Sequence, residues 1–156
     1  MFRLLIVEDE ENSRKGLKST LAPIPNLEID TACDGREGCL KAIRWNPDII
    51  ISDIHMPVWD GLVMTEKLCK KGFAGTIYLL TGYAEFEYAR KAITLGVNDY
   101  LLKPVSSRDI LEAVDRSKAQ ILECRARRIE RQSHSITQRE LFSAICTAAS
   151  WMGPAQ

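Results

Sequence analysis

Residues 48–61 read DIIISDIHMPVWDG and hold the pattern that decides the fold. The run Asp48–Ser52 shows little polar alternation, which is typical of a parallel strand buried on both faces. It ends in Asp53, and after a short loop a helical pattern covers Gly61–Lys71. We therefore predict a strand, a loop and a helix, with a carboxylate at the carboxyl end of the strand.

The same alternation of short apolar runs and helical patterns occurs five times along the chain. Gly and Pro residues stand between the segments, as expected at the ends of helices. Five such units with short loops predict an α/β fold, namely a five-stranded doubly wound parallel sheet with helices on both faces. The other predicted strands are Arg3–Val7, Leu27–Ala32, Thr76–Leu80 and Asp99–Leu102, and the other predicted helices are Asn12–Leu21, Gly35–Trp45, Glu85–Leu95 and one that begins near Ser106.

The C-terminal part of the chain is predicted to be an extended helix. Helix-forming residues continue through Ile129, but apolar positions become sparse after Val114. One interpretation is the solvated end of the fifth helix followed by a frayed segment. The other is a linker helix that pairs with a second copy, because Leu122, Ala126 and Ile129 have heptad-like spacing. We expect a domain over residues 1–120 and a helical linker or tail over residues 121–156.

The composition excludes several classes of protein. The 156 residues include 21 basic and 21 acidic side chains, so the chain is not a globally basic nucleic-acid binder. The net charge of zero combines −4 over residues 1–115 with +4 over residues 116–140. No apolar stretch approaches the ~20 residues of a membrane span. Five cysteines without a CxxC pair indicate reduced thiols, so we expect a cytoplasmic protein without a membrane partner.

Polar side chains stand at the carboxyl ends of four predicted strands. These are Glu8 and Asp9, Asp53, Thr81, and Lys103. Ligands bind at this edge of a doubly wound sheet. Clustered carboxylates repel one another unless a cation joins them, and oxygen ligands suit Mg²⁺ or Mn²⁺. With a metal bound, Asp53 is a candidate nucleophile toward phosphorus, and Lys103 and Thr81 are candidates to neutralise phosphoryl oxygens.

Three stretches carry a family resemblance: LLIVEDEENSRKGL at residues 4–17, IISDIHMPVWDG at 50–61 and LLTGYAEFEYARKAITLGVNDYLLKP at 79–104. Together they resemble the receiver domain of two-component response regulators, over about residues 1–120. The resemblance implies a flavodoxin-like, CheY-like sheet with strand order 2-1-3-4-5. It makes Asp53 the phosphoacceptor, Asp9 and Glu8 the acidic pair that holds Mg²⁺, and Lys103 the lysine of the site.

Further roles follow from the same resemblance. The backbone carbonyl of His55 becomes a metal ligand, Thr81 the switch hydroxyl and Tyr100 the switch aromatic residue. The side chains of His55 and Tyr83 are expected to set the lifetime of the phosphoryl group. The bond that precedes Pro104 is expected to be cis.

The resemblance also implies partners. A histidine kinase would donate the phosphoryl group, and the protein would be a signalling switch rather than a turnover enzyme. The face built from the fourth helix, fifth strand and fifth helix is expected to form a homodimer after phosphorylation, with Lys91, Asp99 and Arg116 at its rim. The stretch 82–104 looks most like YesN-type regulators. We therefore expect transcriptional output through an AraC-type DNA-binding domain absent from this chain, and residues 121–156 to begin a truncated output region.

Three other function classes are alternatives. A haloacid-dehalogenase-type phosphatase would need a second Asp two positions after Asp53, where His55 stands. A nucleotide-binding module would need a Gly-rich loop after the first strand, but residues 8–16 are acidic there. The third alternative is a stand-alone or phosphorylation-independent receiver that acts as a protein-binding module.

Overall fold

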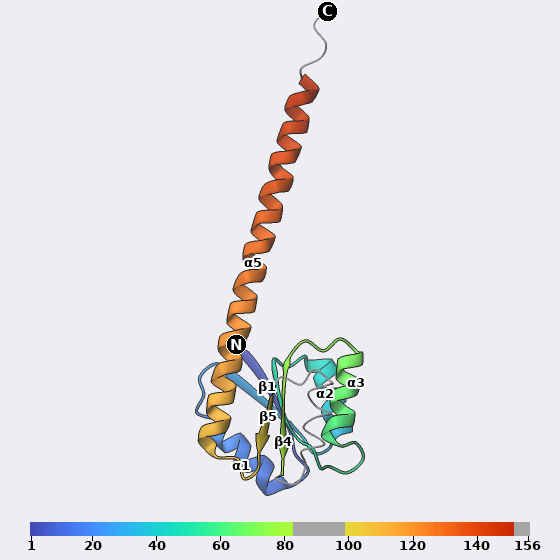
Figure 1. The fold of residues 1–156 in the computed structure, drawn as a ribbon, viewed down its shortest axis with the longest axis vertical. Coiled ribbons are helices and arrows are strands. Elements are labelled where there is room, and N and C mark those ends of the chain that lie inside the picture. Colours follow the sequence, from blue (N-terminus) through green and yellow to red (C-terminus); the bar gives the residue numbers. More distant parts are fainter. Residues whose placement is uncertain (83–98, 152–156) are drawn as a thin grey trace, which may run out of the picture. The chain divides into compact units, whose positions relative to one another are not determined.

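The described part of the chain forms one parallel sheet. The computed structural model describes residues 1–82 and 99–151, with side chains described for residues 1–82 and 100–131. Within these ranges five strands lie in the order β2-β1-β3-β4-β5, which confirms the predicted fold (Figure 1). The strands are β1 (Phe2–Val7), β2 (Leu27–Ala32), β3 (Ile49–Asp53), β4 (Thr76–Thr81) and β5 (Asp99–Leu102).

Strand β3 differs from the prediction by one residue at each end. It begins at Ile49 and includes Asp53, because Asp53 still pairs with Leu80 of β4. All five residues of β3 are buried, as the uninterrupted apolar pattern predicts for a central parallel strand. The last residue of this strand is therefore an acidic group on rigid backbone.

The helices described are α1 (Glu11–Leu21), α2 (Gly35–Trp45), α3 (Gly61–Lys70) and α5 (Ser107–Trp151). In Figure 1, α1 and the first part of α5 lie on one face of the sheet, and α2 and α3 lie on the other. Asp34 and Asp60 begin α2 and α3 as N-caps, because each side chain accepts hydrogen bonds from backbone N–H groups of the first turn.

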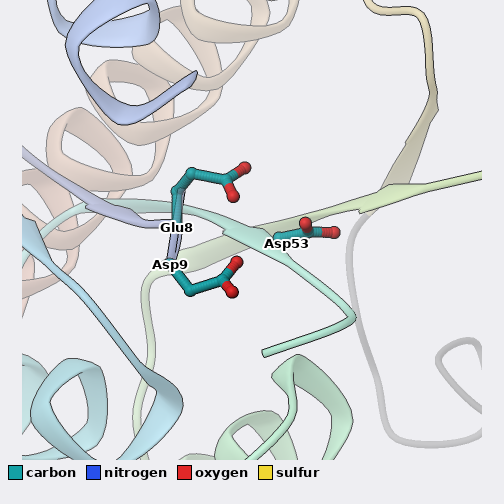
Figure 2. A group of neighbouring side chains, drawn as sticks. All are labelled: Glu8, Asp9 and Asp53. Carbon is teal, nitrogen blue, oxygen red and sulfur yellow. The ribbon is translucent and has the colours of Figure 1, made fainter. Parts of the chain in front are cut away.

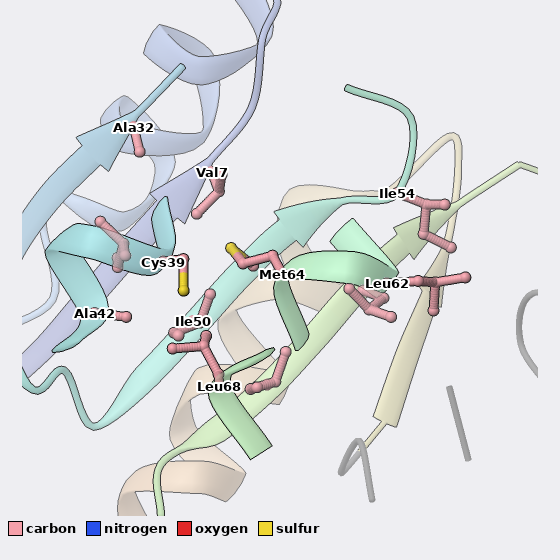
Figure 3. Packing of buried hydrophobic residues seen from close by; sticks show 12 residues of the cluster. Val7, Ala32, Cys39, Ala42, Ile50, Ile54, Leu62, Met64 and Leu68 are labelled. Carbon is pink, nitrogen blue, oxygen red and sulfur yellow. The ribbon is translucent and has the colours of Figure 1, made fainter. Parts of the chain in front are cut away.

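A hydrophobic cluster lies between the sheet and the helices α2 and α3 (Figure 3). Cys39 and Ala42 of α2 and Met64 and Leu68 of α3 are all buried against Ile50 of β3. Burial of a large apolar side chain is worth about 1.5–3 kcal/mol, so this layer holds α2 and α3 on the sheet. Their outward faces remain available to solvent.

The predicted extended C-terminal helix is present. Ser106 and Asp109 cap the N-terminus of this helix by hydrogen bonds to each other. The Asp109 N–H donates to Ser106 Oγ at 3.1 Å, and the Ser106 hydroxyl donates to Asp109 Oδ2 at 2.6 Å. The helix runs past Ile129 to Trp151, because neither Gly nor Pro interrupts residues 105–152. The chain divides into two compact units, Met1–Lys118 and Ala119–Gln156, and the sheet belongs to the first.

Several predicted features lie outside the described residues. These are the helix Glu85–Leu95, Tyr83, and the side chains of Lys91 and Asp99. Within the described residues, no helix has the length and apolar character needed to cross a bilayer. Cys33, Cys39, Cys69 and Cys124 are thiols that form no disulfide, in agreement with the sequence.

Candidate functional site

Three carboxylates meet at the carboxyl ends of β1 and β3. Glu8 and Asp9 directly follow β1, and Asp53 ends β3. These strands are parallel neighbours in which Val7 pairs with Ser52, so the next residues, Glu8 and Asp53, lie side by side. Oxygen atoms from the three side chains all lie within 4.8 Å of one another (Figure 2). Residues separated by more than forty positions thus form one acidic cluster.

The burial of this cluster is uneven. Glu8 is 2% exposed and Asp53 is 8% exposed, whereas Asp9 faces solvent. Oε1 of Glu8 accepts the Glu10 N–H at 3.3 Å, but within the described part of the chain the buried Oε2 accepts no hydrogen bond. Burial, and then the charge of Asp53, raise the pKa of Glu8, although Lys103 opposes them.

Lys103 is the cation of the site. It follows β5, and its Nζ donates to Asp53 Oδ2 at 2.6 Å and lies 3.5 Å from Glu8 Oε2. Burial disfavours the Lys103 ammonium, but the hydrogen bond to Asp53 and the charges of Asp53 and Glu8 outweigh burial and raise its pKa. The lysine therefore stays protonated beside the carboxylate. The peptide bond from Lys103 to Pro104 is cis.

The backbone around Asp53 fits closely against the start of α3. The Ile54 N–H donates to Asp53 Oδ1 at 2.7 Å, and the Gly61 N–H donates to the Ile54 carbonyl at 2.8 Å. A Cβ on Gly61 would lie 2.3 Å from the Asp53 carbonyl oxygen, so only glycine fits there. The end of the loop after β3, at Gly61, thus packs against Asp53 and Ile54 at its start.

Thr81 and Tyr100 lie on the two strands at the edge of the sheet. Thr81 ends β4, is 2% exposed, and donates its hydroxyl to the Gly82 carbonyl at 3.3 Å. Tyr100 pairs with Leu79 and is 37% exposed. Because side chains alternate along a strand, Thr81 and Tyr100 project from the same face of the sheet.

The remaining predicted residues differ in position. His55 is exposed in the loop after β3, directly beyond Ile54, while Tyr83 lies outside the described residues. Trp45 and Trp59 are partly buried and pack against the core cluster.

Sequence reasoning missed Arg14. Its Nη1 donates to the Glu8 carbonyl at 2.6 Å and to the Asp9 carbonyl at 3.2 Å, so it holds the backbone that carries both carboxylates. The available signal was a cation on the first helix shortly after four consecutive acidic residues.

The arrangement suits chemistry on a phosphoryl group. A hard divalent cation prefers oxygen ligands, and the buried Glu8 Oε2 accepts no hydrogen bond from the described residues. Glu8, Asp9 and Asp53 therefore fit a Mg²⁺ ion, while Lys103 supplies a fixed positive charge beside Asp53. A carboxylate between a metal site and an ammonium is well placed to act as a nucleophile toward phosphorus.

Comparison with known proteins gives one family. Residues 4–115 match the model of the response regulator receiver domain. The chain is 33% identical over 115 residues to the transcriptional regulatory protein LiaR of Bacillus subtilis (strain 168), covering 73% of this chain and 54% of that protein. It is 30% identical over 123 residues to the uncharacterized transcriptional regulatory protein YesN of the same strain, covering 78% of this chain and 33% of that protein.

A solved structure gives the same result for the fold. The REC domain of AraT, a response regulator from Geobacillus stearothermophilus, is 33% identical with a TM-score of 0.72 and covers 80% of this chain and 98% of that one. The present chain spans about half the length of LiaR and a third of that of YesN. Because the matched residues cover most of the chain and include the acidic cluster, the protein belongs to the response regulator receiver family.

Proposed function

We propose that Asp53 accepts a phosphoryl group from a histidine kinase in a Mg²⁺-dependent reaction. The observation that carries the proposal is the 2.6 Å contact between Lys103 Nζ and Asp53 Oδ2, beside two further carboxylates within 4.8 Å. A carboxylate oxygen of Asp53 forms the new bond to phosphorus, and the phosphorus–nitrogen bond of the phosphohistidine breaks. The imidazole leaves with the electron pair of that bond.

The side chains around Asp53 have different proposed roles in the reaction. Glu8, Asp9, Asp53 and the carbonyl of His55 would hold the Mg²⁺ ion, which when bound supplies positive charge to the transferring group. Lys103 already lies against Asp53, so its ammonium needs little movement to contact a phosphoryl oxygen. The exposed His55 would border the group and influence its hydrolysis, and we propose the same for Tyr83.

The proposed response begins at Thr81. Its 3.3 Å hydrogen bond to the Gly82 carbonyl is long for a hydroxyl donor, so the hydroxyl can exchange it for a phosphoryl oxygen. Tyr100, on the same face and partly exposed, would then turn inward and change the surface formed by β5 and the first part of α5. The protein would act as a signalling switch rather than as a turnover enzyme.

Phosphorylation of Asp53 is testable by mass. The protein would be incubated with acetyl phosphate and Mg²⁺, and intact-mass spectrometry should show the addition of one phosphoryl group. Asp53→Asn should abolish the addition, whereas Asp115→Asn, at an exposed position of α5, should not. Chelation by EDTA should also abolish it. Failure of the wild-type protein to gain the group would instead favour a phosphorylation-independent protein-binding module.

We further propose that phosphorylation promotes a homodimer through the surface of β5 and α5. Arg116 is exposed on this surface, whereas Lys91 and Asp99, the other charged groups proposed for its rim, have side chains outside the described residues. Beryllofluoride with Mg²⁺ mimics the phosphoryl group, and light scattering should then show a doubled mass. A monomer at high concentration would refute the dimer.

We also propose that residues 1–120 are the receiver and that residues 121–156 begin an output region. The chain divides into its two compact units between Lys118 and Ala119, which supports this boundary. Control of transcription through a DNA-binding domain, AraC-type as in YesN-like regulators, is the proposed output, and the names of LiaR and YesN as transcriptional regulators support it. Cytoplasmic location is proposed from the four described thiols.

A further inference from the structure

A groove unrelated to the acidic cluster lies on the outward side of α2 and α3. The two helices and the loop after β3 enclose a volume of about 780 Å³. This is within the range of pockets that bind ligands or peptide side chains. All residues that line the groove belong to the first compact unit.

The groove has exposed apolar residues in its lining. Leu40 is 50% exposed, Ile43 is 47% exposed and Val58 is 68% exposed, and all three line the same groove. Leu40 and Ile43 are not needed for the core, because α2 contacts the sheet through Cys39 and Ala42. A single exposed apolar residue is ordinary, but three around one groove indicate an interaction surface.

The rim of the groove is cationic. Arg36, Lys67, Lys70 and Lys71 line it, and none of the described residues that line it is acidic. Lys70 pairs with Glu66 at 2.5 Å, whereas within the described ranges no carboxylate forms an ion pair with the other three. This basic rim stands out because residues 1–115 carry a net charge of −4. The groove therefore offers both apolar contact and positive charge.

Val58 adds a second, independent observation. Its φ of 69° lies in the left-handed region, which costs a β-branched residue roughly 1–2 kcal/mol. Since its side chain is mostly exposed, burial within the chain does not offset this cost. Unfavourable backbone of this kind is found where a side chain serves binding. Here it presents two methyl groups to the groove.

The groove is also in contact with the loop that follows Asp53. The Trp59 ring lies beneath Lys67 Nζ, which is 4.6 Å from the ring centroid. The Trp59 carbonyl accepts the Gly35 N–H at 3.1 Å, and a Cβ on Gly35 would lie 2.3 Å from that oxygen. An occupant of the groove would thus touch a segment fixed between Asp53 and α2.

We propose that the α2–α3 groove, defined by Leu40, Ile43, Val58 and the four cations, binds an acidic amphipathic segment of a partner protein. Such a segment places apolar side chains against Leu40, Ile43 and Val58 and carboxylates against the cations. A polyanion without apolar groups would leave Leu40, Ile43 and Val58 in water. A flat anionic membrane surface would not fill a concave groove. A protein segment can contact both the apolar residues and the cations of the groove.

The test uses the complete chain and a synthetic peptide of about 14 residues with two leucines one helical turn apart among glutamates. Fluorescence anisotropy should show saturable binding, and a peptide with lysine in place of glutamate should not bind. Ile43→Asp and Lys67→Glu should each weaken binding about tenfold, a loss of about 1.4 kcal/mol. The matched controls Leu122→Asp on α5 and Lys18→Glu on α1 should leave it within about twofold.

Val58→Gly separates binding from folding. Glycine relieves the left-handed backbone and should raise the melting temperature, yet it should weaken peptide binding because the methyl groups are lost. Binding that is absent, equally weakened in the controls, competed by anionic phospholipid vesicles, or replaced by self-association of the protein would overturn the proposal. None of these measurements requires phosphorylation of Asp53, so their outcome is independent of the proposed function.

Discussion

Replacing Glu8 by glutamine should make the metal-free protein more stable. The wild-type carboxylate is 2% exposed, and its Oε2 accepts no hydrogen bond within the described residues. A buried charge without full hydrogen bonding destabilises the folded state. Glutamine keeps nearly the same shape and removes the charge.

The magnitude follows from the neighbouring charges. At 4.8 Å and an effective dielectric constant of about 20, Asp9 and Asp53 each repel Glu8 by about 3.5 kcal/mol. Lys103, 3.5 Å from Glu8, attracts it by about 4.7 kcal/mol in the same treatment. A net repulsion of roughly 2 kcal/mol remains, and the exposure of Asp9 and Lys103 reduces it. We therefore expect Glu8→Gln to raise the free energy of unfolding by about 1–2 kcal/mol.

The pH dependence has a definite sign. Because the pKa of Glu8 is raised in the folded state, the wild-type protein loses stability as the pH rises through that pKa. The glutamine variant has no such loss. The difference between the two proteins should be small near the ordinary value of 4.5 and should grow toward neutral pH.

Urea unfolding in EDTA at about pH 8 and at about pH 4.5 measures both effects. Glu112→Gln is the matched control, because this exposed carboxylate pairs with Arg108 at 2.7 Å and its loss should cost under about 0.5 kcal/mol. In the presence of Mg²⁺ the order of stability of the wild-type protein and Glu8→Gln should change. Metal binding stabilises the wild-type protein by mass action, and loss of a ligand should weaken that effect about tenfold in affinity.

Two results would refute this reasoning. One is a glutamine variant that is less stable than the wild-type protein in EDTA at about pH 8. The other is an unchanged response to Mg²⁺, which would remove Glu8 from the metal site.

Three further substitutions test the surroundings of the site. Gly61→Ala should lower the free energy of unfolding by about 2 kcal/mol in urea, because the added Cβ meets a carbonyl 2.3 Å away, whereas Gly16→Ala on open helix surface should raise it slightly. Tyr78→Phe should cost about 1–2 kcal/mol in thermal unfolding, since its buried hydroxyl bonds Ser117 at 2.8 Å; an unchanged midpoint would contradict this. The backbone N–H of Cys33 is the main reason why the pKa of Glu37 is lowered to about 2, so Glu37→Gln should destabilise at neutral pH. That loss should vanish as the pH falls from 4.5 toward 2, and an acid titration of stability that shows no such convergence would count against it.

The sequence predicted the architecture because parallel strands have a strong local signature. The residues of β3 are uniformly apolar up to Ser52, and this pattern requires helices on both faces of the sheet. Strand order and right-handed crossovers then bring the carboxyl ends together at one edge. Glu8 and Asp53 could therefore be placed in one cluster without coordinates.

Other features depended on long-range geometry. The role of Arg14 as a donor to two backbone carbonyls is not visible in its neighbours along the chain. Residues after Val114 were open to two interpretations, a frayed segment or a continuous linker helix, and the structure shows helix to Trp151, where neither Gly nor Pro interrupts it. Apolar content reports burial, whereas helix continuity depends on backbone propensity.

Sequence alone thus determined the sheet and the chemical types at its edge, since both follow from the order and periodicity of residues. Only the tertiary structure decided that Glu8 is buried, with an oxygen that accepts no hydrogen bond from the described residues, and that Lys103 lies 2.6 Å from Asp53. It also decided that Leu40, Ile43 and Val58 border one cationic groove. Burial and charge proximity are properties of packing between segments distant in the chain, so no local pattern encodes them.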